Sequence, residues 1–176
     1  MKVMIAYTSK TGTTEECVER LKAALDGMTV ETVRLDENAP DLDSCDILIL
    51  GAPVRFGKLP KCVRAYLKEN EAKLLQMPHA LFLCCGLAHE YDFYIENLYS
   101  DALRASAFLI ENFGGTLSYE GQNFFGKILI HAVRSTIREN EIEDGEYTPE
   151  MPSILPESIG KMATYIRKEA EKLQKI

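Results

Sequence analysis

The chain has 176 residues, of which 46% are hydrophobic, and a formal net charge of −7 at pH 7. This length and apolar content suit one core, so we expect a single domain over residues 1–176. The negative charge disfavours nucleic acid as a partner, because a polyanion would be repelled. The longest apolar run, 80–88, is too short to span a membrane, and the stretch 3–7 is too short for a signal peptide, so we predict a cytoplasmic protein.

The five cysteines form no CxxC pair, and no histidine stands at metal-ligand spacing, so no metal site is predicted. We expect reduced thiols that are mostly buried. Cys84 and Cys85 are neighbours on an expected strand, where successive side chains point to opposite faces. This favours ordinary packing over a redox pair.

Continuous apolar runs alternate with amphipathic helical patterns, which is typical of a parallel sheet covered on both faces. In the first half of the chain we predict strands at 2–7, 28–34 and 46–51, the second of these near an edge. The 46–51 strand is expected to end at Gly51, because Gly51, Ala52 and Pro53 continue a strand poorly. Helices are predicted at 15–25 and 60–75, and a loop or very short helix at 36–44.

In the second half we predict a strand at 79–85, a helix at 98–112 closed by the glycines at 114 and 115, a fifth strand at 116–120 and a last helix at 159–173. Five strands with crossovers predict a doubly wound α/β domain, which binds ligands beyond the carboxyl ends of its strands. The site should therefore lie just after Tyr7, Gly51 and Cys85.

The segment after the first strand, TSKTGTT at 8–14, contains five hydroxyl residues in seven and runs into a helix. Unpaired backbone N–H groups and the helix dipole attract a phosphate there, and Gly12 permits close approach. The alternative, a simple helix cap, needs one hydroxyl only. The spacings of a Walker loop and of a three-glycine dinucleotide loop are absent. A phosphoacceptor domain is also excluded, because Tyr7 and Gly51 stand where acids would be needed.

The loop SKTGTT at 9–14 resembles the FMN-phosphate loop of the flavodoxin family, in which hydroxyl residues surround a glycine after the first strand. The motifs GAPVRFG at 51–57 and MPHALF at 77–82 look like the branch that contains menaquinone-dependent protoporphyrinogen IX dehydrogenase. The resemblance spans nearly the whole chain. It implies a flavodoxin-like five-stranded parallel sheet with helices on both faces, an insertion before the last helix, and FMN as the cofactor.

The resemblance also implies which residues bind FMN. The phosphate would be held by hydroxyl and backbone N–H groups of Ser9, Lys10, Thr11, Gly12, Thr13 and Thr14. The flavin ring would be edged by Pro53, Val54, Arg55, Phe56 and Gly57, and contacted from the third loop by Gly86, Leu87 and Tyr91.

Individual roles follow for three residues of the second loop. Phe56 would lie against the ring, or alternatively anchor the loop in the core. Arg55 would approach the pyrimidine edge, or alternatively form an exposed salt bridge. Gly57 accepts either peptide orientation, so its carbonyl can turn toward flavin N5 and favour one-electron steps. No catalytic acid or base is assigned, and His89 is interpreted as a solvated loop residue.

The stretch 121–156 is too long for a simple link to the last helix. Its first half begins at Phe124 and ends at Asn140, and an apolar stripe flanked by Lys127, Arg134 and Arg138 predicts an amphipathic helix. A related insertion marks the protoporphyrinogen-dehydrogenase-like branch. We expect it to dock on a membrane surface or a partner, which allows a peripheral membrane location. The alternative is that the stripe packs on the domain.

The sequence thus predicts an FMN-binding redox protein that mediates electron transfer to a redox partner protein or a quinone. One alternative is a protoporphyrinogen or quinone-linked FMN oxidoreductase, so whether the chain is an enzyme stays open. Another is a non-redox module that binds a phosphate ligand, since fold does not dictate function and the chain has no tryptophan, a common flavin-stacking residue of the family.

Overall fold

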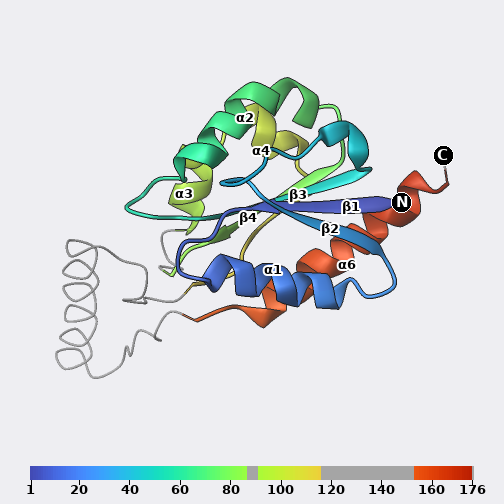
Figure 1. Ribbon diagram of the computed structural model, residues 1–176, viewed down its shortest axis with the longest axis horizontal. Helices are drawn as coiled ribbons and strands as arrows, with labels where there is room; N and C mark the ends of the chain where they lie inside the picture. The colour runs from blue at the N-terminus through green and yellow to red at the C-terminus, as the bar shows by residue number, and fades with distance from the viewer. Residues whose placement is uncertain (87–90, 116–152, 176) are drawn as a thin grey trace.

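A parallel sheet lies between two layers of helices in the computed structural model, which describes residues 1–86, 91–115 and 153–175 (Figure 1). Within these ranges the sheet has the order β2-β1-β3-β4-β5, and every neighbouring pair is parallel. The strands are β1 (Lys2–Tyr7), β2 (Thr29–Arg34), β3 (Ile47–Pro53), β4 (His79–Cys84) and β5 (Leu109–Asn112). The predicted doubly wound α/β fold is confirmed, with β2 at one edge.

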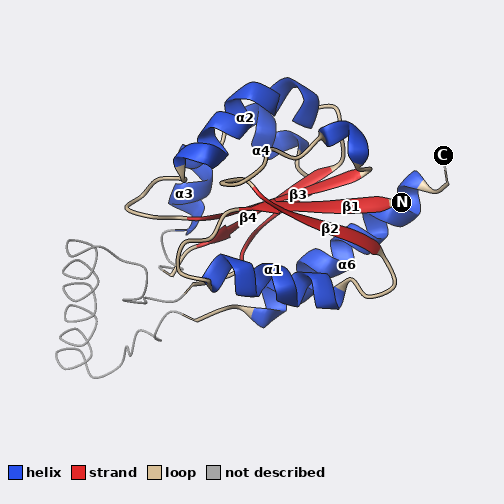
Figure 2. Ribbon diagram, viewed as in Figure 1, coloured by secondary structure: helices blue, strands red, loops and turns tan. Residues whose placement is uncertain are grey.

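The helices cover both faces of the sheet (Figure 2). One face is covered by α1 (Thr13–Ala24) and α6 (Pro156–Leu173), and the other by η1 (Leu42–Ser44), α2 (Lys61–Leu74), α3 (Tyr91–Leu98) and α4 (Asp101–Ser106). Alternation along β1 sends Val3 and Ile5 to the first face and Met4 to the second. Among the described residues, none of the helices combines the length and the apolar character needed to cross a membrane.

The predicted helix at 98–112 is wrong. The structure has α3 up to Leu98, then the short α4, then β5. Ser100 begins α4 as its N-cap, because its hydroxyl accepts the N–H of Leu103 at 3.2 Å. The apolar run after α4 is too short for periodicity to distinguish a strand from a helix. The fifth strand of the described sheet is therefore 109–112, and Gly114 and Gly115 follow a strand. The predicted strand at 116–120 lies outside the described residues.

Strand β3 continues through Pro53, so the prediction that it ends at Gly51 is also wrong. Gly51 is needed for the packing of the core. A Cβ there would lie 2.0 Å from Cζ of Phe82, its partner in the register of β3 and β4. The Phe82 ring is held in turn by a stacked contact with Phe113, with centroids 4.1 Å apart. The glycine thus admits an aromatic pair to the core.

The cysteines agree with the sequence-based expectation. All five thiols are free, and Cys17, Cys84 and Cys85 are buried. Cys84 packs in the core cluster under α1 and α6, whereas Cys85 packs in the cluster under α2. The prediction that these neighbours point to opposite faces is confirmed.

Candidate functional site

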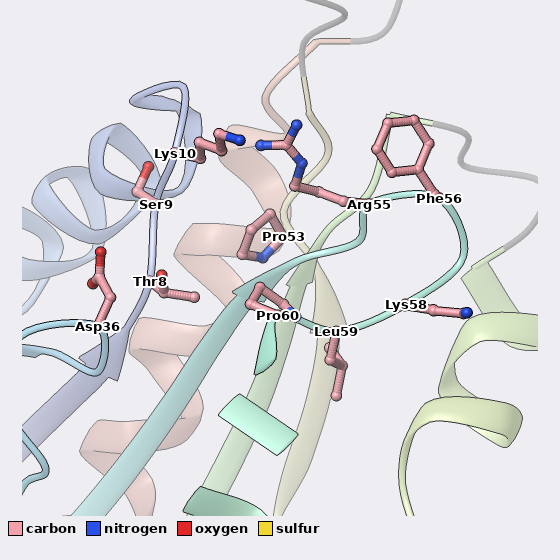
Figure 3. Close-up of a pocket in the computed structure, with 10 residues that line it drawn as sticks. All are labelled: Thr8, Ser9, Lys10, Asp36, Pro53, Arg55, Phe56, Lys58, Leu59 and Pro60. Carbon is pink, nitrogen blue, oxygen red and sulfur yellow. The ribbon is translucent and has the colours of Figure 1, made fainter. Parts of the chain in front are cut away.

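A pocket of about 430 Å³ opens at the carboxyl edge of the sheet, between the loops that follow β1 and β3 (Figure 3). From β1 the sheet grows toward β2, and from β3 it grows toward β4, so this is the switch point of the strand order. The pocket is lined by Thr8, Ser9, Lys10, Asp36, Pro53, Arg55, Phe56, Lys58, Leu59 and Pro60. Two of the three predicted loops therefore meet here.

The loop after β1 presents the amino end of α1. Gly12 is the N-cap, with a φ of 85° and no side-chain cap, and apart from its chain neighbours no atom of the described residues lies within 4 Å of the position of an added Cβ. The helix starts with the Glu16 N–H donating to the Gly12 carbonyl at 2.9 Å, and the Glu15 N–H donates to Ser9 Oγ at 3.3 Å. An anion can approach this backbone closely, and the helix dipole favours it.

The hydroxyl residues of this loop are not equivalent. Thr14 is only 2% exposed and lies on the buried side of α1, near the Cys84 thiol in the core. The hydrogen bond with Cys17 and burial raise the pKa of that thiol, so it stays protonated at neutral pH. Thr14 can therefore offer a phosphate its backbone N–H but not, in this arrangement, its hydroxyl. Thr11 and Thr13 are half-buried and Lys10 is exposed.

The loop after β3 is a two-residue turn. Arg55 and Lys58 exchange two backbone hydrogen bonds of 3.0 Å, and both central residues have a positive φ, 51° at Phe56 and 69° at Gly57. Turns of this kind need the left-handed region, which a bulky residue such as Phe56 occupies at a cost. The Phe56 ring is 64% exposed, so the alternative of a core anchor is wrong. Figure 3 shows the ring at the rim of the pocket.

Three cationic residues line the same pocket: Lys10, Arg55 and Lys58. Arg55 comes from the turn and Lys10 from the first loop, and Figure 3 shows their side chains directed toward one another across the pocket. Burial lowers the pKa of the Arg55 guanidinium, which still carries its charge at neutral pH. Its central carbon lies 5.9 Å from the centroid of the Phe56 ring. The pair favours an anionic ligand at this side of the pocket.

Asp36 also lines the pocket, and sequence reasoning missed it. Hydrogen bonds from Arg34 are the main reason why the pKa of Asp36 lies below its usual value, and Thr8 contributes to a smaller extent. An acid two residues after the second strand was the available signal. Its importance becomes visible only when β2 is placed beside β1.

The third predicted loop is described in part. Leu87 and His89 lie outside the described residues, as does the predicted docking segment 124–140. Gly86 is half-buried, and Tyr91 is the first residue of α3, where burial raises the pKa of its hydroxyl.

Asn112 braces this third loop, and nothing in the sequence pattern indicated it. Its side chain is 7% exposed, and Oδ1 accepts the N–H of Cys85 at 3.3 Å and that of Gly114 at 2.9 Å. Gly115 then packs on the loop, because a Cβ there would come within 2.9 Å of the Gly86 nitrogen. The end of β5 thus supports the end of β4.

A protein-family model described as a flavodoxin domain matches residues 4–143. The chain belongs to the flavodoxin domain family. The sheet order and the pocket at its switch point agree with this assignment. None of the curated proteins matches the chain significantly.

Several solved structures resemble this flavodoxin domain. The two-electron reduced flavodoxin of Megasphaera elsdenii is 23% identical, with 62% of this chain and 82% of that chain covered and a TM-score of 0.49. The Fusobacterium nucleatum flavodoxin bound to flavin mononucleotide is 16% identical, with 96% and 98% covered and a TM-score of 0.46. A flavo di-iron protein of Thermotoga maritima is 18% identical, with 77% and 36% covered and a TM-score of 0.50. Identities this low support a likeness of fold only.

Proposed function

We propose that this flavodoxin domain binds one FMN in the pocket between the loops after β1 and β3 and uses it to transfer electrons. The observation that carries the proposal is the amino end of α1, left open at Gly12. Lys10 and Arg55 border the neighbouring pocket of about 430 Å³, a volume within the usual range for cofactor sites. A helix amino end with adjacent cations suits a phosphate at the end of an otherwise neutral ligand.

The residues of the chain would bind and orient the cofactor. The phosphate would meet the backbone of 9–14, with the Ser9, Thr11 and Thr13 side chains and Lys10 around it. The ring would lie along 53–57, with Gly86, Leu87 and Tyr91 on its other side. When bound, FMN supplies the electron-transfer chemistry, and the protein supplies position and electrostatics.

Titration with FMN and with riboflavin tests the proposal. We expect FMN to bind about a hundredfold more tightly, because two hydrogen bonds to a charged phosphate together contribute about 3 kcal/mol or more. Quenching of flavin fluorescence measures both dissociation constants. Equal affinities for the two flavins, or no binding of either, would show that the helix end does not receive a phosphate and would favour a different phosphate ligand without redox chemistry.

Gly57→Ala tests the role of the turn in electron transfer. A Cβ at Gly57 would meet only Tyr94 Cε1 at 3.9 Å, so alanine fits, but φ is 69° and the left-handed region costs alanine about 1 kcal/mol. We expect the Gly57 peptide to reorient less freely and the two one-electron midpoint potentials to move closer together. A spectroscopic redox titration measures both potentials.

Gly27→Ala is the matched control for this variant. Gly27 has a φ of 84° and open space around it, and it follows α1 at the end away from Gly12. Alanine there carries the same backbone strain without touching the pocket. Unchanged potentials in Gly57→Ala, or the same shift in both variants, would remove Gly57 from the redox mechanism.

The electron acceptor we propose is a redox protein or a quinone. The protoporphyrinogen or quinone-linked oxidoreductase is the second candidate, favoured by the GAPVRFG motif at 51–57 and by the long segment before α6. Peripheral docking through 124–140 belongs to the same candidate. Quinone-dependent oxidation of protoporphyrinogen by the FMN-loaded protein would support the enzyme, and electron exchange without that turnover would support the carrier.

A further inference from the structure

Arg34 contacts the phosphate-binding loop from outside the pocket. Arg34 is the last residue of β2 and pairs with Tyr7 in the register of β1 and β2, so it lies beside the start of that loop. Its Nη2 donates to the Ser9 carbonyl oxygen at 2.9 Å. In a trans peptide the C=O and the next N–H point in opposite directions, so this bond directs the Lys10 N–H away from Arg34.

The same guanidinium contacts three carboxylates. It forms a two-pronged contact with Asp36, Nη2 to Oδ2 at 2.9 Å and Nε to Oδ1 at 3.3 Å. Glu37 Oε1 lies 3.3 Å from Nε, and Glu15 Oε2 lies 3.5 Å from Nη1. The Arg34 side chain is 26% exposed, whereas those of Asp36, Glu15 and Glu37 are 39%, 46% and 63% exposed, so only the guanidinium side of these contacts is shielded from solvent.

Two of the three carboxylates lie near the place where the phosphate is expected. Glu15 stands in the first turn of α1 and also accepts the Tyr7 hydroxyl at 3.4 Å, and Asp36 lines the pocket. Unpaired, these acids would repel a phosphate dianion at short range, where screening by salt is weak. A cation in contact with all three carboxylates offsets part of that repulsion.

We infer that Arg34 is a positioning residue for the FMN phosphate: it orients the Ser9 peptide and offsets one of the three negative charges of Glu15, Asp36 and Glu37, which weakens their repulsion of a dianion. The inference rests on the proposed function. The expected FMN contacts do not include β2 or the turn that follows it. The inference states that this part of the chain controls the preference for phosphorylated over unphosphorylated flavin.

Arg34→Met removes both the charge and the donor. We expect its FMN affinity to fall about tenfold or more, which corresponds to the loss of one interaction with a charged group. Riboflavin affinity should change less than about twofold, since riboflavin has no phosphate. Arg34→Lys keeps the positive charge but not the planar guanidinium that donates to several acceptors at once, so its FMN affinity should lie between those of Arg34→Met and the wild type.

Two further variants sharpen the test. Arg20→Met removes the same charge from the exposed face of α1, where Arg20 pairs with Glu16 at 2.6 Å, and should leave FMN affinity nearly unchanged at equal ionic strength. Asp36→Asn added to Arg34→Met should restore part of the FMN affinity, because one repelling charge is gone.

The outcomes separate this inference from the function on which it rests. If the wild type does not prefer FMN to riboflavin, the proposed function fails. If the wild type does prefer FMN and Arg34→Met retains that preference, or loses both flavins equally, Arg34 is only structural and the inference is overturned. Should Arg34→Met not fold, FMN and riboflavin titrations of Arg34→Lys decide the matter, because an unchanged preference in it also overturns the inference.

Discussion

Gly51→Ala is expected to destabilise the protein by about 3 kcal/mol, at the upper end for an overpacked core. The added Cβ would lie 2.0, 2.4 and 2.6 Å from three ring atoms of Phe82. That ring is completely buried and stacked on Phe113, which is completely buried as well, so it has no free space to enter. Thermal unfolding followed by circular dichroism should show a melting temperature lower by about 6–12 °C.

Gly160→Ala provides the control for this experiment. Gly160 lies within α6, with nothing within 4 Å of an added Cβ. Alanine is the better helix former by about 1 kcal/mol, so this change should leave the melting temperature equal or raise it. Phe82→Leu combined with Gly51→Ala should recover part of the loss. An unchanged melting temperature in Gly51→Ala would mean that the aromatic pair does not require the glycine.

Gly12→Val is expected to abolish the preference for FMN over riboflavin, a loss of about a hundredfold in FMN affinity. Gly12 has a φ of 85°, which a β-branched residue almost never adopts, so the loop must change its backbone to accept valine. The open space beside Gly12 is also where we propose that the phosphate approaches. Isothermal titration with both flavins measures the change, and riboflavin affinity should stay nearly constant.

Gly27→Val separates strain from location in this second experiment. Gly27 has nearly the same φ, 84°, and equally open surroundings at the other end of α1. It should lose stability to a similar extent while keeping its FMN affinity. If Gly12→Val binds FMN as the wild type does, the helix end is not the phosphate site. If Gly27→Val loses FMN as strongly, strain in α1 explains the effect.

The elements that were predicted correctly have long or uniform patterns. The continuous apolar runs at β1, β3 and β4 and the amphipathic repeat of α6 each contain enough residues to identify their structure. Strand β5 has only four residues, Leu109–Asn112, and pairs with a single neighbour, β4. Its backbone hydrogen bonds come from that neighbour, so its own residues carry too little information to reveal it.

The candidate site divides in the same way. The segments 8–14 and 53–57 could be singled out from the sequence because their chemistry lies in consecutive residues, and both contribute residues to the pocket. The inward direction of the Thr14 side chain could not, because it depends on where α1 begins: the helix starts at Thr13, which puts Thr14 on the same buried stripe as Cys17, Val18 and Leu21. The exposure of Phe56 likewise depends on the geometry of the turn.

The sequence by itself determined the α/β class and the position of a hydroxyl-rich loop before a helix, because apolar periodicity and loop composition are local properties. Only the tertiary structure brought Arg34 and Asp36 to that loop and Asn112 beneath the third loop. Arg34 lies 25 positions from Ser9, and Asn112 lies 27 positions from Cys85. Their contacts arise from the order β2-β1-β3-β4-β5, in which β2 lies beside β1 and β5 lies beside β4. Which strands become neighbours is settled by the folded sheet and not by local sequence patterns.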